Sequence, residues 1–221
     1  MRRYGVTAAL LGLFLFTAVT CAWGSDGKLV QAERYLLYVP ANFEAASGAR
    51  PLVLALSPSA RSYDMILAWE SVADRHGWFI VASKEFHNGI EAEPIFETLM
   101  RDARELAKSY SIDMRKIVAT GFSGGAMGAH MLSVNYPAEV AAVVANCGRI
   151  ENAYRTKPYP RGKLAVFIAS PTDWNYAGMR DDAQWLSGRG WTTHWIEFAD
   201  GHAAAPTSLN EEAAAWLEPH L

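Results

Sequence analysis

The chain has 221 residues, of which 51% are hydrophobic, so it can close one sizeable core in a single domain without disulfides or a metal. Its formal net charge of −3 offers no basic surface to a phosphate backbone, which excludes nucleic acid as an expected partner. Composition leaves the charge of a substrate open.

The N-terminal segment has the pattern of a secretory signal peptide. Arg2 and Arg3 precede an apolar run from Val6 to Val19, which is shorter than the roughly 20 apolar residues of a transmembrane helix. Small residues at Ala22 and Gly24 predict cleavage after Gly24. We therefore expect residues 1–24 to be a signal peptide, residues 25–221 to be one catalytic domain, and the protein to be secreted or periplasmic with no membrane span.

The two cysteines allow one alternative to this interpretation. Cys21 could become a lipidated N-terminus, although Thr20 before it is larger than the residues that such processing favours. If Cys21 is removed with the signal, Cys147 has no partner and the fold does not depend on a disulfide. Cys147 is then interpreted as a small buried residue at a strand end.

After the signal, short apolar runs alternate with longer amphipathic segments, which is typical of β/α units. The predicted strands are Arg34–Val39, Leu52–Leu56, Trp78–Ser83, Lys116–Thr120, Ala141–Ala145, Leu164–Ala169 and Thr192–Phe198. The predicted helices are Tyr63–His76, Pro94–Tyr110, Gly124–Asn135, Asp181–Ser187 and Ser208–Leu217. Several strands are continuously apolar, as strands covered on both faces are. We expect an α/β fold with a mostly parallel sheet of about seven strands, flanked by helices on both faces.

The chemistry-bearing residues lie in the loops that follow these strands. Such loops meet at the carboxyl edge of a parallel sheet, so four of them can converge on one site. The connection 146–163 is too short for a large lid, which predicts an open site. Asp181 and Asp182 are interpreted as the acidic start of a helix.

The strongest motif is Gly121-Phe122-Ser123-Gly124-Gly125, which follows a predicted strand and precedes a predicted helix. Gly-x-Ser-x-Gly in this context is a nucleophile elbow, a strained turn that lifts the serine clear of the sheet. The glycines allow the neighbouring strand and helix to approach closely. Ser123 is therefore the candidate nucleophile, and the Gly124 N–H is a candidate oxyanion donor.

A serine hydroxyl needs a base, and an imidazole needs a carboxylate to orient it. Asp173 follows one late strand and His202 follows the next, which places acid and base after the nucleophile in the order that this kind of site uses. Asp200 is the alternative acid. His87 is the only other loop histidine, but it precedes Ser123.

The second oxyanion N–H is expected from the loop Ser57 to Arg61. Pro58 has no N–H, so we assign this role to Ser59, with Ala60 as the alternative.

These motifs resemble those of α/β-hydrolases, and in detail those of small secreted esterases related to polyhydroxybutyrate depolymerases and feruloyl esterases. The resemblance rests on Leu52 to Arg61, the Ser123 elbow, Thr172-Asp173 and Gly201-His202, and it spans most of the mature chain. It implies ester hydrolysis through an acyl-enzyme, with no cofactor and no metal. One departure is that Ser57-Pro58 stands where relatives commonly carry His-Gly.

Aromatic residues in the same loops are candidates for contacts with a small-molecule or polymer ester. Trp174 and Tyr176 follow the proposed acid, and Phe86 follows another strand, although such residues are more often core packing. A serine peptidase and a non-catalytic binding protein that kept the fold are the alternative functions. The sequence predicts neither the ester nor the oligomeric state.

Overall fold

The computed structural model describes residues 27–41, 43 and 48–221. The predicted signal peptide, its cleavage site and Cys21 lie outside the described residues.

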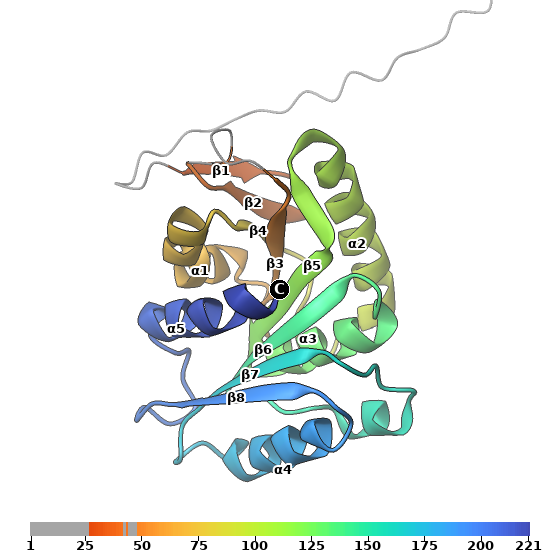
Figure 1. Ribbon diagram of the computed structural model, residues 1–221, viewed down its shortest axis with the longest axis vertical. Helices are drawn as coiled ribbons and strands as arrows, with labels where there is room; N and C mark the ends of the chain where they lie inside the picture. Colours follow the sequence, from red (N-terminus) through yellow and green to blue (C-terminus); the bar gives the residue numbers. More distant parts are fainter. Residues whose placement is uncertain (1–26, 42, 44–47) are drawn as a thin grey trace, which may run out of the picture.

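An eight-stranded sheet runs through the molecule in the order β1-β2-β4-β3-β5-β6-β7-β8 (Figure 1). The strands are β1 (Lys28–Gln31), β2 (Tyr35–Val39), β3 (Arg50–Leu56), β4 (Phe79–Ser83), β5 (Ile112–Phe122), β6 (Val140–Asn146), β7 (Leu164–Ala169) and β8 (Thr192–Glu197). β1 and β2 pair antiparallel, β2 pairs antiparallel with β4, and the other neighbours are parallel. The expected mostly parallel sheet is confirmed.

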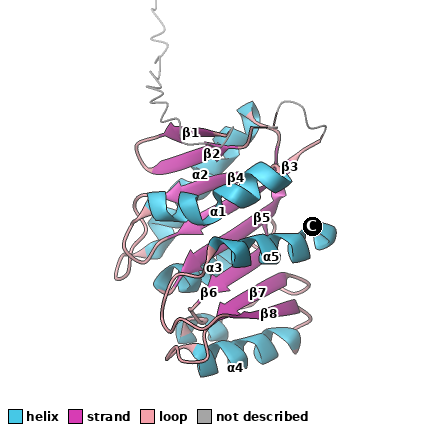
Figure 2. Cartoon of the chain, turned by 90° about the vertical axis from the view of Figure 1, so that its left-hand side faces the viewer, coloured by secondary structure: helices cyan, strands magenta, loops and turns pink. Residues whose placement is uncertain are grey.

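Helices cover both faces of this sheet (Figures 1 and 2). They are α1 (Ser62–His76), α2 (Ala92–Ser109), α3 (Gly124–Asn135), α4 (Tyr176–Ser187) and α5 (Thr207–Leu217), with short 3-10 helices at Asn152–Thr156 and Glu218–His220. α1 and α5 pack on one face, and α2, α3 and α4 pack on the other. This two-sided cover is the expected α/β architecture.

The central strands show why their sequences are continuously apolar. Every side chain from Leu52 to Leu56 in β3 is fully buried. Successive side chains point to opposite faces, so Leu54 packs under α2 and α3 whereas Val53 packs under α1 and α5. Each residue of such a strand contributes to a core, which leaves no polar alternation.

The structure corrects the sequence prediction in three places. β1 was missed because four residues with exposed ends carry no periodic signal, and the strand forms by pairing with β2. α4 begins at Tyr176, five residues before the predicted start. Asp182 is consequently inside the helix, where it is buried, accepts a hydrogen bond from the Ile150 N–H at 2.6 Å and pairs with Arg155.

The connection between β6 and β7 contains only the short 3-10 helix among the described residues, so no large lid covers the carboxyl edge there. None of the helices in the described part of the chain has the length and apolar character to span a bilayer.

Candidate active site

Three loops at the carboxyl edge bring Ser123, His202 and Asp173 into one row. His202 Nε2 lies 2.9 Å from Ser123 Oγ, and His202 Nδ1 lies 3.0 and 3.1 Å from the two carboxylate oxygens of Asp173. Ser123 follows β5, Asp173 follows β7 and His202 follows β8, so parallel strands deliver all three side chains to the same edge.

Ser123 occupies a strained turn between β5 and α3. Its φ of 55° and ψ of −119° lie outside the regions that side chains normally adopt. Two glycines make the turn possible, since a Cβ at Gly121 would lie 2.3 Å from the Gly125 carbonyl carbon and one at Gly125 would lie 2.0 Å from the Leu56 carbonyl oxygen. The close approach of strand, turn and helix therefore requires glycine at both positions.

The side chains of Asp173 and His202 differ in how far they are exposed to solvent. The Asp173 side chain is fully buried and the His202 side chain is 14% exposed. Asp173 Oδ1 also accepts a hydrogen bond from the Asn175 N–H at 2.9 Å, which orients the carboxylate. Asp200, the alternative acid, is exposed on the surface. The carboxylate in contact with the imidazole is that of Asp173.

Cys147 directly follows β6 and is buried, as predicted. Burial, together with the neighbouring Asp173, raises the pKa of its thiol to about 12. The thiol therefore stays protonated and is not a competing nucleophile.

Both candidate oxyanion donors lie near Asn88, which the sequence did not single out, in the loop that also carries Phe86 and His87. Gly124 faces the side chain of Asn88, whose Oδ1 would lie 1.8 Å from a Cβ at that position. The Asn88 N–H in turn bonds the Pro58 carbonyl at 2.9 Å. The Ser59 N–H makes only a long hydrogen bond of 3.4 Å to Ser57 Oγ, which leaves it able to donate to a closer acceptor. Ala60, the alternative donor, has a φ of 57°.

Asn88 could not be found from sequence, because an asparagine in a loop is more often a turn residue. Its position beside Gly124 results from the isolated bridge between Ser59 and His87, which joins two loops far apart in the chain.

Of the three aromatic candidates, only Trp174 has a side chain that contacts the side chains of Ser123, His202 or Asp173. Its indole stacks on the His202 ring with centroids 3.8 Å apart and remains 74% exposed. Phe86 is in the core, stacked on Phe96, and Tyr176 donates a hydrogen bond from its hydroxyl to Glu197 on the outer strand β8. The structure thus places Phe86 and Tyr176 in packing roles rather than at the mouth of the site.

A hollow of about 240 Å³ lies next to these loops. Its lining includes Ser57 to Ser59, Phe122, and Ala204 with Ala205, which come from the loop between β3 and α1, the end of β5 and the segment after His202. Met65 and the buried Trp69 of α1 give it an apolar wall. The hollow is smaller than pockets that enclose drug-sized ligands, which are about 300–1,000 Å³.

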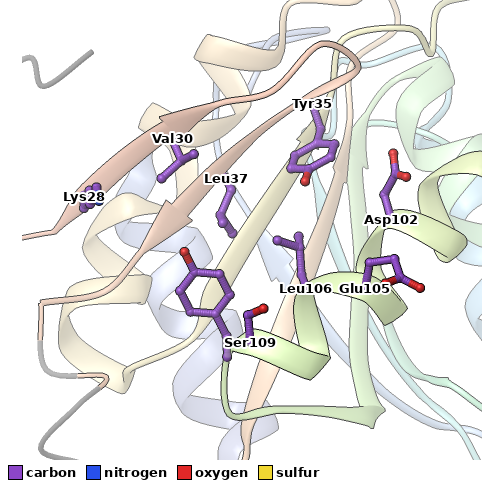
Figure 3. Close-up of a pocket in the computed structure, with 9 residues that line it drawn as sticks. Lys28, Val30, Tyr35, Leu37, Asp102, Glu105, Leu106 and Ser109 are labelled. Carbon is purple, nitrogen blue, oxygen red and sulfur yellow. The ribbon is translucent and has the colours of Figure 1, made fainter. Parts of the chain in front are cut away.

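Larger hollows lie beside β1 and β2. One of about 390 Å³ lies between Tyr35 and Leu37 of β2 and the α2 side chains that include Asp102 and Leu106 (Figure 3). Asp102 is held there in an ion pair with Arg34 at 2.9 Å. Neither this hollow nor the smaller one is lined by Ser123, Asp173 or His202, but only the smaller one is lined by residues that flank Ser123 and His202 in the chain, so volume alone does not identify the site.

No group of three or more His, Cys, Asp or Glu side chains within the described ranges is arranged to hold a metal ion.

No protein-family model matches the sequence, and a comparison with curated protein sequences finds no match. Solved structures do match. The fluorophosphonate-binding serine hydrolase FphF of Staphylococcus aureus has a TM-score of 0.66 at 11% identity, over 86% of this chain and 96% of that one. The chain has the α/β-hydrolase fold.

Two further structures show the same likeness. A Bacillus cereus carboxylesterase matches at 18% identity and a TM-score of 0.64, over 85% of this chain and 94% of its own. The esterase PE8 matches at 19% identity and a TM-score of 0.64, over 84% of this chain and 97% of its own. At these identities the likeness concerns the fold, so an activity has to be argued from the side chains.

Proposed function

We propose that the protein is a serine hydrolase that cleaves carboxylic esters through an acyl-enzyme intermediate. The observation that carries the proposal is the row in which Ser123 Oγ, the His202 imidazole and the Asp173 carboxylate are joined by contacts of 2.9 and 3.0 Å at a strained elbow. A structural role would not require a strained serine that contacts an oriented imidazole.

In this mechanism, the Ser123 oxygen attacks the ester carbonyl while its proton passes to His202 Nε2. The carbonyl oxygen becomes an oxyanion, to which the N–H groups of Gly124 and Ser59 are proposed to donate. The imidazolium then gives the proton to the departing alkoxide, which leaves as the alcohol. A water molecule repeats the sequence on the acyl-enzyme, releasing the acid and restoring the serine. Asp173 keeps the Nδ1 proton in place and stabilises the charged imidazole throughout.

The proposed substrates are esters with a small acyl group. The hollow beside the elbow holds about 240 Å³ and has an apolar wall, which suits a short chain better than a long one. The exposed ring of Trp174 is available to an aromatic or sugar group at the mouth. Methyl ferulate and short hydroxyalkanoate oligomers are therefore the specific substrates to test beside simple esters.

Two other functions are less well supported. A serine peptidase would use the same three side chains, but it usually needs a domain or lid to select peptides, and the described part of the chain has no large lid. A non-catalytic binding protein would be favoured by the altered Ser57-Pro58 loop. A binding role alone would not explain why Ser123, His202 and Asp173 are joined by hydrogen bonds.

A fluorophosphonate probe tests the proposal directly. We expect covalent labelling of the purified protein, no labelling of Ser123→Ala, and hydrolysis of p-nitrophenyl acetate and butyrate in preference to octanoate. Unlabelled wild type, or undiminished labelling of Ser123→Ala, would refute a serine hydrolase. A labelled protein that cleaves peptides but no ester would favour the peptidase.

We also propose that the protein is exported and processed after Gly24, on the basis of its N-terminal pattern. Mass spectrometry of the protein from the native host would then find Ser25 at the N-terminus. A lipid-modified Cys21 would support the alternative.

A further inference from the structure

The segment that carries His202 has no regular structure of its own. Residues 198–206 form neither helix nor strand between β8 and α5. Its first residue continues the sheet through a hydrogen bond from the Phe198 N–H to the Ala169 carbonyl at 3.1 Å. An irregular segment needs other contacts to hold one side chain within a few tenths of an ångström.

Two buried side chains supply such contacts on either side of His202. Ser170 Oγ accepts a hydrogen bond from the Gly201 N–H at 2.9 Å, directly before the histidine. Asn146 Oδ1 accepts one from the Ala205 N–H at 3.0 Å, just after it. Ser170 is fully buried and Asn146 is 7% exposed. Asn146 is itself oriented, because its Nδ2 donates to the Ile168 carbonyl at 3.3 Å.

The main chains of the same two residues hold the other members of the row. The Asn146 carbonyl accepts a hydrogen bond from the Ser123 N–H at 2.8 Å. The Ser170 carbonyl accepts one from the Asp173 N–H at 2.9 Å. Asn146 therefore connects the serine turn to the histidine segment, and Ser170 connects the aspartate turn to that segment.

We propose that Asn146 and Ser170 are positioning residues that hold His202, the base, at hydrogen-bonding distance from the nucleophile Ser123 and the acid Asp173. The inference rests on the proposed hydrolase function. Removal of either side-chain acceptor leaves a main-chain N–H without its partner and frees one end of the segment, so the imidazole samples positions farther from Ser123 Oγ. The contact between Ser123 Oγ and His202 Nε2, across which the proton is transferred, is then weakened although Ser123, His202 and Asp173 are themselves unchanged.

Alanine variants of both residues test this. A misplacement of about 1 Å can cost on the order of 10²-fold in rate, so we expect Ser170→Ala and Asn146→Ala to lower kcat for p-nitrophenyl acetate by about that factor. Ser170 does not line the hollow beside the elbow, so its substitution should leave KM nearly unchanged. Ser133→Ala is the matched control, since Ser133 is equally buried and bonds a main-chain carbonyl at 2.7 Å in α3. It removes one buried serine hydrogen bond, here a bond donated to a carbonyl rather than one accepted from an N–H, and should keep full kcat.

Coupling to the base separates positioning from general destabilisation. In a His202→Ala background, Ser170→Ala should cause no further loss of the residual rate, because there is no imidazole left to position. Equal losses in both backgrounds, or full kcat in Ser170→Ala and Asn146→Ala, would overturn the inference. Wild-type protein that neither labels nor hydrolyses would instead refute the proposed function.

Hydrogen exchange keeps the inference testable if a variant does not fold. In wild-type protein the amides of Gly201 and Ala205 should be protected although their segment is irregular. Free exchange at both amides would show that the contacts do not hold the segment, and would overturn the inference.

Discussion

Asp173→Asn should abolish most of the proposed activity by reversing one hydrogen bond. Asp173 Oδ1 accepts from the Asn175 N–H at 2.9 Å, so an asparagine at this position would keep its amide oxygen there. Its NH₂ group would then occupy the Oδ2 position, 3.0 Å from His202 Nδ1. A donor at that point competes with the amide oxygen, which lies 3.1 Å from Nδ1, and favours the tautomer in which Nδ1 accepts and Nε2 carries the proton.

An imidazole protonated at Nε2 cannot take the Ser123 proton, because its acceptor nitrogen is then Nδ1, which faces residue 173 instead of Ser123. In serine proteases the same tautomer error lowers the rate by about 10⁴-fold, which corresponds to about 5.4 kcal/mol of activation free energy. We expect a loss of this size in kcat/KM for p-nitrophenyl acetate. The fold should persist, since asparagine has nearly the volume of aspartate.

Asp200→Asn is the matched control, because Asp200 is exposed two residues before His202. It should retain wild-type turnover. Both variants should be followed by thermal unfolding beside the kinetics. A loss below tenfold in Asp173→Asn, or a large loss in Asp200→Asn, would refute the assignment of Asp173 as the acid.

Three further predictions follow from other contacts. Gly125→Ala should destabilise the fold by about 1–3 kcal/mol or more in urea unfolding, since its Cβ would lie 2.0 Å from the Leu56 carbonyl oxygen, whereas at Gly188 the nearest atoms are 3.6 Å away and alanine should be tolerated. Burial lowers the pKa of His130 to about 3, below the 6.5 of the unfolded chain, so its contribution to stability is complete above pH 6.5 and is lost as the pH falls toward 3. Between about pH 7 and about pH 4.5 the wild type should lose about 2.5 kcal/mol of stability through His130, and His130→Gln should remove this part of the loss; an unchanged loss would contradict the prediction. Trp174→Ala should change stability by less than about 0.5 kcal/mol, as an exposed site does, but should lower kcat/KM because the indole stacks on the imidazole; unaltered kinetics would remove it from the site.

The elements that sequence predicted well are those whose local pattern is the cause of their structure. β7 was predicted with its observed bounds, Leu164–Ala169, because a strand buried on both faces is apolar at each position. α3 was also predicted as Gly124–Asn135, since a glycine-rich turn precedes it and Pro137 follows it. β1 was not predicted, because its stability comes from pairing with β2 rather than from its own residues.

Candidate roles were predictable from sequence where the motif itself carries the chemistry. Ser123 could be singled out by its turn, and Asp173 and His202 by their positions after successive strands. Roles that depend on neighbours could not be distinguished in this way. Phe86 and Trp174 both follow strands in aromatic loops, yet the first is buried and the second is exposed over an imidazole.

The sequence by itself determined the fold class and the three side chains to examine, because buried strands and a glycine-rich elbow impose their patterns on adjacent residues. The tertiary structure alone decided which carboxylate meets the imidazole, where Asn88 lies, and how Asn146 and Ser170 hold the segment that bears His202. These contacts join residues far apart in the chain. Their geometry depends on the register of the whole sheet, which no local pattern contains.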